Sequence, residues 1–395
     1  MRLLRDPLFL SVSLNHLLID ILNGLLAIVL VYLSPLLELS NADIGLIVTI
    51  YITTSSLLQP VFGWLSDRLS IHWFGGFGLL WMTVWFASAI LVAGRASLVL
   101  LVIGGFGSGM FHPTGTERAA TRGRALMAGR AATAASIFFL FGQGGLAAGP
   151  AIGGFLLEGF GLVGLLLICG AAVPVAVNSL WQARREKIKA SLEDETVTDE
   201  YTETRPNRWL LLAFVLLVIT RSMPQQIAMT FIPKMLLDQG FSAAAYGAIA
   251  SLLMSGAALG GVFGGVAADR FGRRRTVFWT LTLSIAPFYF LPVTSGPLQY
   301  LLIFLAGGLS GASHSIIVVL AQSFMPRRMA LASGLTLGFM FTSGSIGAYF
   351  AGVAADAMSL TLVLQFNAVL AVIGALFSLS LGQKPPTPIS VSVSG

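Results

Sequence analysis

Long apolar stretches separated by short polar connections recur along nearly the whole chain. Each is close to the roughly 20 residues with which a helix crosses a bilayer, where every backbone group must be bonded within its own segment. A membrane β-barrel would instead show short segments of alternating polarity. The pattern therefore predicts an all-α membrane protein with twelve transmembrane helices, at about 8–37, 43–65, 73–94, 97–117, 130–157, 161–181, 209–237, 243–266, 276–293, 298–322, 330–354 and 360–381.

Composition and charge placement support this interpretation. The chain is 56% apolar and only 10% charged, whereas soluble domains carry about 25% charged residues. All but three of the 23 Lys and Arg lie at the chain ends or in the even-to-odd connections, which the positive-inside rule places in the cytoplasm. We therefore expect a multi-pass protein of the inner (plasma) membrane with both termini cytoplasmic. The net charge of +6 then reflects topology, and the lipid bilayer, not a nucleic acid, is the expected partner.

The chain contains two halves that align at a constant offset of 202 residues. Ser40, Gly45, Gly63, Asp67, Arg68, Ser108, Gly109, His112, Gly142 and Gly145 match Ser242, Gly247, Gly265, Asp269, Arg270, Ser310, Gly311, His314, Gly344 and Gly347. Such repeats are typical of secondary transporters, which rock one half against the other around a central site. We expect two pseudo-symmetric six-helix bundles at 1–182 and 209–382, a polar cytoplasmic linker at 183–208 and a disordered tail at 383–395.

A glycine- and arginine-rich motif closes the eighth apolar stretch. It comprises Gly265, Asp269, Arg270, Gly272, Arg273 and Arg274 and resembles the loop motif of the major facilitator superfamily. The first-half copy keeps only Gly63, Asp67 and Arg68. Its glycine permits close helix packing, and its aspartate can accept from a helix N-terminus or pair with arginine. We predict a cytoplasmic gate here; the alternative is charge that only sets topology.

The fifth stretch carries a second motif, formed by Gly145, Gly149, Pro150, Gly153 and Gly154. Glycines on one face allow close backbone contact, and a proline removes one backbone hydrogen bond and kinks the helix. The motif resembles the antiporter motif of the same superfamily, which implies export in exchange for another solute. Ordinary packing of small residues is the alternative.

Polar residues inside the apolar stretches gather on the first, fourth, seventh and tenth. An ionisable group in the hydrocarbon costs a few kcal/mol on insertion scales, so each needs a reason. Asp20 is the only acid near the middle of a stretch, and His16 and Asn23 share its helical face. We predict proton coupling by Asp20 and His16, and substrate binding by Asn23, His112, Arg221, Gln225 and His314.

Asp20 and Arg221 lie at nearly equivalent positions of the repeat. We expect them to face each other across a central cavity, so that protonation of Asp20 frees Arg221 to hold an anionic substrate. The alternative is a static ion pair that fixes helix packing.

Beyond these motifs, the chain resembles the fosmidomycin resistance proteins within the superfamily. The residues that carry the resemblance are His16 to Asp20, Ser55 to Pro60, Gly107 to Pro113, Ala286 to Phe288, Ala321, Gln322 and Pro326. The resemblance implies a major facilitator fold and proton-driven export of a small, drug-like compound. The compound that names this family is an anionic phosphonate, which suits a cavity with one arginine and two histidines.

Two other functions stay open at this point. A proton-coupled symporter that takes up a small organic anion would use the same fold and cavity. A membrane receptor or enzyme is the other class, but the chain has no HExxH, no GxSxG and no output domain. Cys169 is the only cysteine, which excludes an intrachain disulfide and a cysteine-based metal site. We expect a monomeric transporter of a small molecule and protons, not an enzyme, without cofactor or metal.

Overall fold

The computed structural model describes residues 3–69, 73–126, 131–190, 208–324 and 329–381. Every regular element within these ranges is helical. After a short 3₁₀ turn at Leu3–Arg5, the helices are α1 (Pro7–Leu37), α2 (Asn41–Leu69), α3 (Phe74–Leu91), α4 (Ala96–Leu126), α5 (Ala131–Gly164), α6 (Leu166–Ala190), α7 (Arg208–Asp238), α8 (Ala243–Phe271), α9 (Arg273–Phe290), α10 (Pro297–Gly311), α11 (His314–Phe324), α12 (Met329–Ala357) and α13 (Leu360–Ser378).

Eleven segments in this part of the chain are long and apolar enough to cross a membrane. The twelfth expected span is α9, whose 18 residues begin with three consecutive arginines. The expected twelve-span, all-α membrane protein is therefore confirmed, with one difference. The tenth span was expected to be continuous over 298–322, but it divides into α10 and α11 at Ala312 and Ser313.

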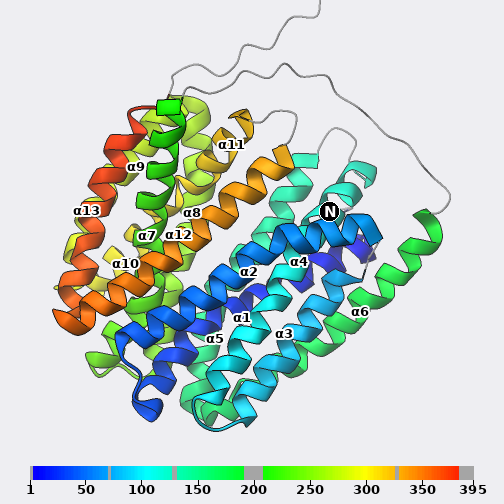
Figure 1. Cartoon of the computed structure of the whole chain (residues 1–395), viewed down its shortest axis with the longest axis horizontal. Coiled ribbons are helices and arrows are strands. Elements are labelled where there is room, and N and C mark those ends of the chain that lie inside the picture. The colour runs from blue at the N-terminus through cyan, green and yellow to red at the C-terminus, as the bar shows by residue number, and fades with distance from the viewer. Residues whose placement is uncertain (1–2, 70–72, 127–130, 191–207, 325–328, 382–395) are drawn as a thin grey trace, which may run out of the picture.

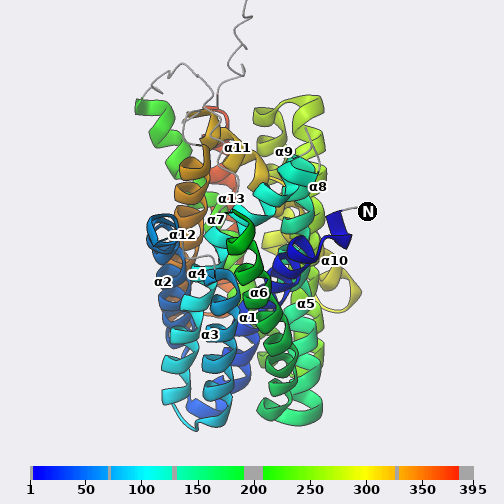
Figure 2. The same cartoon turned by 90° about the vertical axis from the view of Figure 1, so that its right-hand side faces the viewer.

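The helices form two bundles that follow the two halves of the sequence. Figure 1 shows α1 to α6, coloured blue to green, on one side and α7 to α13, coloured green to red, on the other. Figure 2 shows the same division from the side. Between the bundles, α2 packs along α12 and α5 packs along α8. α6 extends to Ala190, into the range expected for the linker, and the linker and tail stay predictions; residues 191–207 and the predicted tail lie outside the described residues.

Local sequence explains where several helices begin and end. The Asp6 carboxylate accepts from the Phe9 N–H at 2.9 Å, and Pro7 follows at the first helical position, where its missing N–H has no consequence. Ser242 caps α8 in the same way. Between α8 and α9, Gly272 has a φ of 87°, which glycine adopts without the strain that a side chain would bring.

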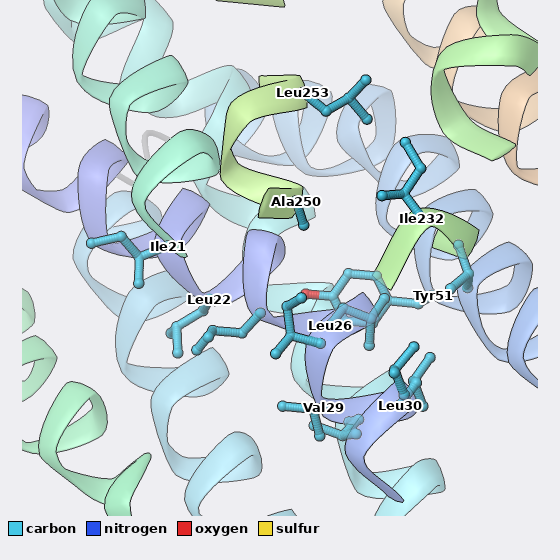
Figure 3. Packing of buried hydrophobic residues seen from close by; sticks show 14 of the residues in the cluster. Ile21, Leu22, Leu26, Val29, Leu30, Tyr51, Ile232, Ala250 and Leu253 are labelled. Atoms are coloured by element: carbon cyan, nitrogen blue, oxygen red, sulfur yellow. The ribbon is translucent and has the colours of Figure 1, made fainter. Parts of the chain in front are cut away.

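The bundles approach most closely at one end of the molecule, where α1 turns into α2 and α7 turns into α8. We call it the closed end. A Cβ on Gly45 would lie 2.6 Å from the Ala348 carbonyl oxygen, and one on Gly154 would lie 2.3 Å from that of Ala243. Only glycine permits such backbone contact between bundles. Apolar packing continues across this junction, because Leu26 of α1 and Ala250 of α8 belong to one cluster of buried residues, part of which Figure 3 shows.

Candidate functional site

The first candidate site surrounds Asp20, which is 5% exposed near the middle of α1. The Nε2 atom of His16, one turn earlier, lies 3.2 Å from its Oδ2 atom. The Nε2 atom of His112, on α4, lies 3.6 Å from its Oδ1 atom. Asn23 donates to the same Oδ1 at 2.9 Å. We call this group the Asp20 cluster; its members are Asp20, His16, Asn23, Tyr51, Ser108 and His112.

Hydrogen bonds link the Asp20 cluster to α2 and α4. The Tyr51 hydroxyl donates to Asn23 Oδ1 at 2.8 Å, and Asn23 Nδ2 also donates to the Ser108 hydroxyl at 3.1 Å. Neither Tyr51 nor Ser108 was predicted as a site residue. A tyrosine within an apolar stretch gives no functional signal by itself, although the repeat match of Ser108 with Ser310 could have indicated it.

The backbone determines which nitrogen of each histidine carries a proton. His16 Nδ1 lies 2.9 Å from the Phe138 carbonyl oxygen, and His112 Nδ1 lies 2.8 Å from that of Ser108. A carbonyl only accepts, so both Nδ1 atoms must donate. Both Nε2 atoms then point at the Asp20 carboxylate, and each such contact becomes attractive when a proton lies between nitrogen and oxygen. Such an arrangement of a carboxylate and two imidazoles can take up and release protons.

Two residues of α5 shape the cluster from the other side. Phe138, which is fully buried, stacks on the His16 ring with a centroid distance of 4.2 Å. A Cβ on Gly142 would lie 2.4 Å from His16 Nε2 and 2.7 Å from Asp20 Oδ2. A side chain at this position would enter the contact between the two groups. Gly142 is thus a positioning residue that the repeat marked but whose role only the structure reveals.

The second candidate site lies in the other bundle around Arg221, which is 3% exposed on α7. Its guanidinium donates to the Ser310 carbonyl at 3.0 Å and to Gln225 Oε1 at 2.8 Å. It also donates to the Ser313 hydroxyl at 3.0 Å. Its NH1 atom lies 3.3 Å from His314 Nδ1. We call this group the Arg221 cluster; its members are Arg221, Gln225, Ser310, Ser313 and His314.

The two histidines at equivalent repeat positions have opposite tautomers. A guanidinium only donates, so His314 Nδ1 beside Arg221 must accept and the proton lies on Nε2. In His112 the proton lies on Nδ1, because that atom faces a carbonyl. The hydrogen-bond partner of Nδ1 therefore determines which ring nitrogen carries the proton. In His314 this leaves an Nε2–H donor that is directed away from Arg221.

Arg221 forms no ion pair with any acid in the described part of the chain. We expected Asp20 and Arg221 to face each other as partners, but each finds its partners within its own bundle. The expected substrate residues divide accordingly: Asn23 and His112 join Asp20, while Gln225 and His314 join Arg221. A buried cation without an acid partner is costly, and it offers a site for an anionic ligand.

Arg221 also explains the interruption between α10 and α11. The Ser310 carbonyl accepts from both Nε and NH2 of Arg221 and from the Ser313 hydroxyl. In a continuous helix this carbonyl would accept from the backbone N–H of residue 314. Side-chain donors thus occupy the acceptor, and the helix opens at Ala312 and Ser313. An apolar pattern carries no signal for this competition.

The predicted antiporter motif forms a tight seam along α5. A Cβ added to Gly145 would lie 2.3 Å from the Leu17 carbonyl oxygen, and one added to Gly149 would lie 2.6 Å from the Ile21 carbonyl oxygen. At Gly153 it would meet Leu25, and at Gly154 it would meet α8 of the other bundle. Beside Pro150, the Ala151 N–H donates to the Ser251 hydroxyl of α8 at 2.9 Å. The predicted close packing is confirmed; the link to antiport stays a prediction.

The predicted gate motif is not engaged in this structure. A Cβ added to Gly265 would have no neighbour within 4 Å, so this glycine is not needed for close packing. The preceding Gly264 is, because a Cβ there would lie 2.2 Å from the Ala312 carbonyl oxygen. Asp269 is exposed and forms no ion pair with Arg273 or Arg274 among the described residues. Arg270 lies over the Phe271 ring.

In the first-half copy of the gate motif, only Gly63 and Arg68 can be described. Gly63 faces Pro113 of its own bundle, Arg68 lies over Trp64, and the Asp67 side chain lies outside the described residues. Gating by these residues stays a prediction for another conformation, and Gly272 serves as the turn between α8 and α9.

Comparison with known proteins gives matches over the whole membrane part. The sequence profile of the Major Facilitator Superfamily matches residues 8–225 and 210–394. The fosmidomycin resistance protein of Escherichia coli (strain K12) is 30% identical over 93% of this chain and 90% of its own length. An uncharacterized MFS-type transporter of Bacillus subtilis (strain 168), YfnC, is 28% identical over 96% of this chain and 94% of its own.

Solved structures show the same fold at low sequence identity. A bacterial homolog of the human lysosomal transporter Spinster, in an inward-facing and occupied conformation, has a TM-score of 0.77 at 16% identity and covers 95% of this chain and 96% of its own. The nucleoside transporter NupG has a TM-score of 0.70 at 17% identity and covers 95% and 100%. The family match confirms a transporter rather than an enzyme. The chain is thus a multi-pass membrane transporter that belongs to the Major Facilitator Superfamily.

Proposed function

We propose that the protein is a proton-coupled antiporter that exports a small anionic molecule. The observation that carries the proposal is the division of charge between the bundles: a carboxylate between two histidines on α1 and α4, and on α7 a buried guanidinium with no acid partner among the described residues. Asp20 and His16 take up the proton, and Arg221, Gln225 and His314 hold the anionic group. Asn23 and His112 complete the site from the first bundle. The seam along α5 and the resistance protein of E. coli support export.

Exchange requires that proton and substrate exclude each other, because ligands that favour each other's binding travel together. A direct Asp20–Arg221 ion pair would instead make proton binding and substrate binding favour each other, since protonation of Asp20 would free Arg221 to bind the anion. With separate clusters, a substrate excludes the proton if it also presents a hydrogen-bond donor to Asp20. The substrate we infer therefore carries an anionic group for Arg221 and His314 and a donor for Asp20.

The Lys and Arg distribution further supports an inner-membrane protein with both termini in the cytoplasm. The closed end then faces outward. Labelling of single cysteines in 183–208 tests this orientation; modification by an impermeant reagent applied from outside intact cells contradicts it.

Asp20→Asn tests the proton site, because it retains the shape and the acceptor oxygen of a protonated carboxyl group. Fosmidomycin is the first probe, followed by a panel of small phosphonates and carboxylates selected by thermal stabilisation of the purified protein. In proteoliposomes we expect the variant to exchange substrate for substrate but to lose proton-driven accumulation. Full proton-driven transport by Asp20→Asn contradicts the assignment and moves the search to the histidines.

Arg221→Lys tests the anion site with the charge retained. Lysine lacks the planar fork that reaches Ser310 and Gln225 together. We expect substrate affinity to fall about 10- to 100-fold, the equivalent of one or two charge-assisted hydrogen bonds. Unchanged affinity, measured by thermal stabilisation or exchange, shows that the anionic group binds elsewhere.

A further inference from the structure

The Asp20 cluster has the arrangement of a metal site. Both histidines donate Nδ1–H to a backbone carbonyl, His16 to Phe138 and His112 to Ser108. Metal-binding histidines nearly always anchor their second nitrogen in this way, which fixes the ring and directs the lone pair of the other nitrogen. Here both lone pairs, on the two Nε2 atoms, converge on the Asp20 carboxylate. One ligand atom from each of the three residues lies within 4.8 Å of the others.

The spacing fits a four-coordinate transition-metal ion. Zinc binds histidine nitrogen and carboxylate oxygen at about 2.0–2.2 Å, which places neighbouring ligands of a tetrahedron about 3.3–3.6 Å apart. His16 Nε2 lies 3.2 Å from Asp20 Oδ2, and His112 Nε2 lies 3.6 Å from Asp20 Oδ1. The ligand atoms of the three residues lie within 4.8 Å of one another, so a bound ion would draw them closer together. Two nitrogens and one oxygen favour zinc or cobalt over magnesium or calcium, which prefer oxygen alone.

The exposed fractions of the three side chains indicate the side from which an ion reaches the site. The His112 side chain is 25% exposed, whereas those of His16 and Asp20 are 4% and 7% exposed. The cluster is therefore open on the side of His112. On the side of Gly142 the backbone lies close, because a Cβ there would be 2.4 Å from His16 Nε2 and 2.7 Å from Asp20 Oδ2. The fourth ligand of an open zinc site, a water molecule, would therefore bind from the side of His112.

The repeat provides an internal contrast. His314, the counterpart of His112, turns Nδ1 toward Arg221 and has no carboxylate partner among the described residues. A cation beside a guanidinium is repelled, so the second bundle lacks the corresponding site. The single cysteine had led us to expect no metal, because the sequence does not show that two histidines 96 positions apart meet at one carboxylate.

We propose that His16, Asp20 and His112 bind one zinc-class divalent ion, which occupies the place of the protons shared between the carboxylate and the two imidazoles. A bound ion would then hold the cluster in one state and inhibit transport. This consequence rests on the proposed function, whereas the binding itself does not.

The binding test uses the full chain in detergent, with any affinity tag removed and metal stripped by EDTA. We expect one Co²⁺ or Zn²⁺ per chain after gel filtration and the intense visible absorption of four-coordinate cobalt. His16→Asn and His112→Asn should each weaken Zn²⁺ binding more than about 100-fold, because loss of a supporting partner alone costs 10- to 100-fold. His314→Asn, the matched control, should leave Zn²⁺ affinity and the cobalt spectrum unchanged.

Three results overturn the site: no retained ion in the wild type, the weak spectrum of six-coordinate cobalt, or wild-type affinity in His112→Asn. The first two need no variant, so they decide the question even if a histidine variant does not fold. Zn²⁺ is then added to proton-driven efflux in proteoliposomes, where we expect inhibition. If Zn²⁺ binds as proposed but efflux is unaffected, the metal site stands and the role of Asp20 in proton coupling fails.

Discussion

Two carboxylates at the closed end cross from one bundle to the N-terminus of a helix in the other. Asp356, at the end of α12, accepts from the Asn41 backbone N–H at 2.9 Å, from the Asn41 side chain at 2.9 Å and from the Ala42 N–H at 2.8 Å, all at the start of α2. Glu158 of α5 accepts from the Ala244 N–H at 2.8 Å at the start of α8. Unpaired N–H groups and the helix dipole favour a negative charge at both positions.

Asp356→Ala removes the first of these contacts and should favour opening of this end. A hydrogen bond to a charged group contributes about 1.5–3 kcal/mol when shielded, but Asp356 is exposed, so each bond is worth well under 1 kcal/mol. Three such bonds and about 0.3–1 kcal/mol from the dipole together give about 1–2 kcal/mol. The ratio of open to closed molecules should therefore rise about 5- to 30-fold.

Pulsed electron paramagnetic resonance on spin labels at Leu36 and Val293 measures this ratio, with Cys169 replaced. Both label positions are exposed at the closed end, one in each bundle. Asp238→Ala is the matched control, because this carboxylate at the same end pairs with Lys234 of its own helix. Identical distance distributions for Asp356→Ala and the wild type would show that the Asp356 contacts do not keep this end closed. Glu158→Gln should shift the distribution in the same direction.

Three further predictions concern packing and charge. Gly142→Ala should separate His16 from Asp20 and abolish proton-driven transport while the protein still folds; retained coupling, measured in proteoliposomes, contradicts its positioning role. Gly149→Leu should block transport or folding, because its side chain meets the Ile21 carbonyl; normal proton-driven efflux would show that the seam tolerates separation. Burial raises the pKa of Asp6, but hydrogen bonds from Arg122 and the Phe9 N–H outweigh this effect and hold the pKa below its ordinary value. Its stabilising contribution is therefore present at neutral pH and lost as the pH falls through that lowered pKa. Asp6→Ser keeps the helix cap and should lower stability by about 0.5–1 kcal/mol at pH 7; thermal unfolding should show no such difference in acid.

The amino-acid sequence determined the architecture because the bilayer imposes simple constraints. Apolar length fixes the number of spans, and the constant repeat offset fixes the division into two bundles. Polar groups are too costly in hydrocarbon to face lipid, so Asp20, His112, Arg221 and His314 had to lie inside. The glycines of α5 indicated close packing for a similar reason, since nothing larger fits a helix contact of that kind.

Which polar groups meet depends on how the helices pack in three dimensions. Asp20 and Arg221 are nearly equivalent in the repeat, yet a carbonyl of Ser310 and not a carboxylate holds Arg221. Hydrogen-bond partners depend on the direction of side chains and on backbone atoms that every residue has. The spacing of residues in the sequence therefore does not predict which groups form hydrogen bonds. The same limit applies to the opposite tautomers of His112 and His314 and to the interruption of the tenth span. Sequence periodicity places a residue on a face, but the approach of a neighbouring helix determines its chemistry.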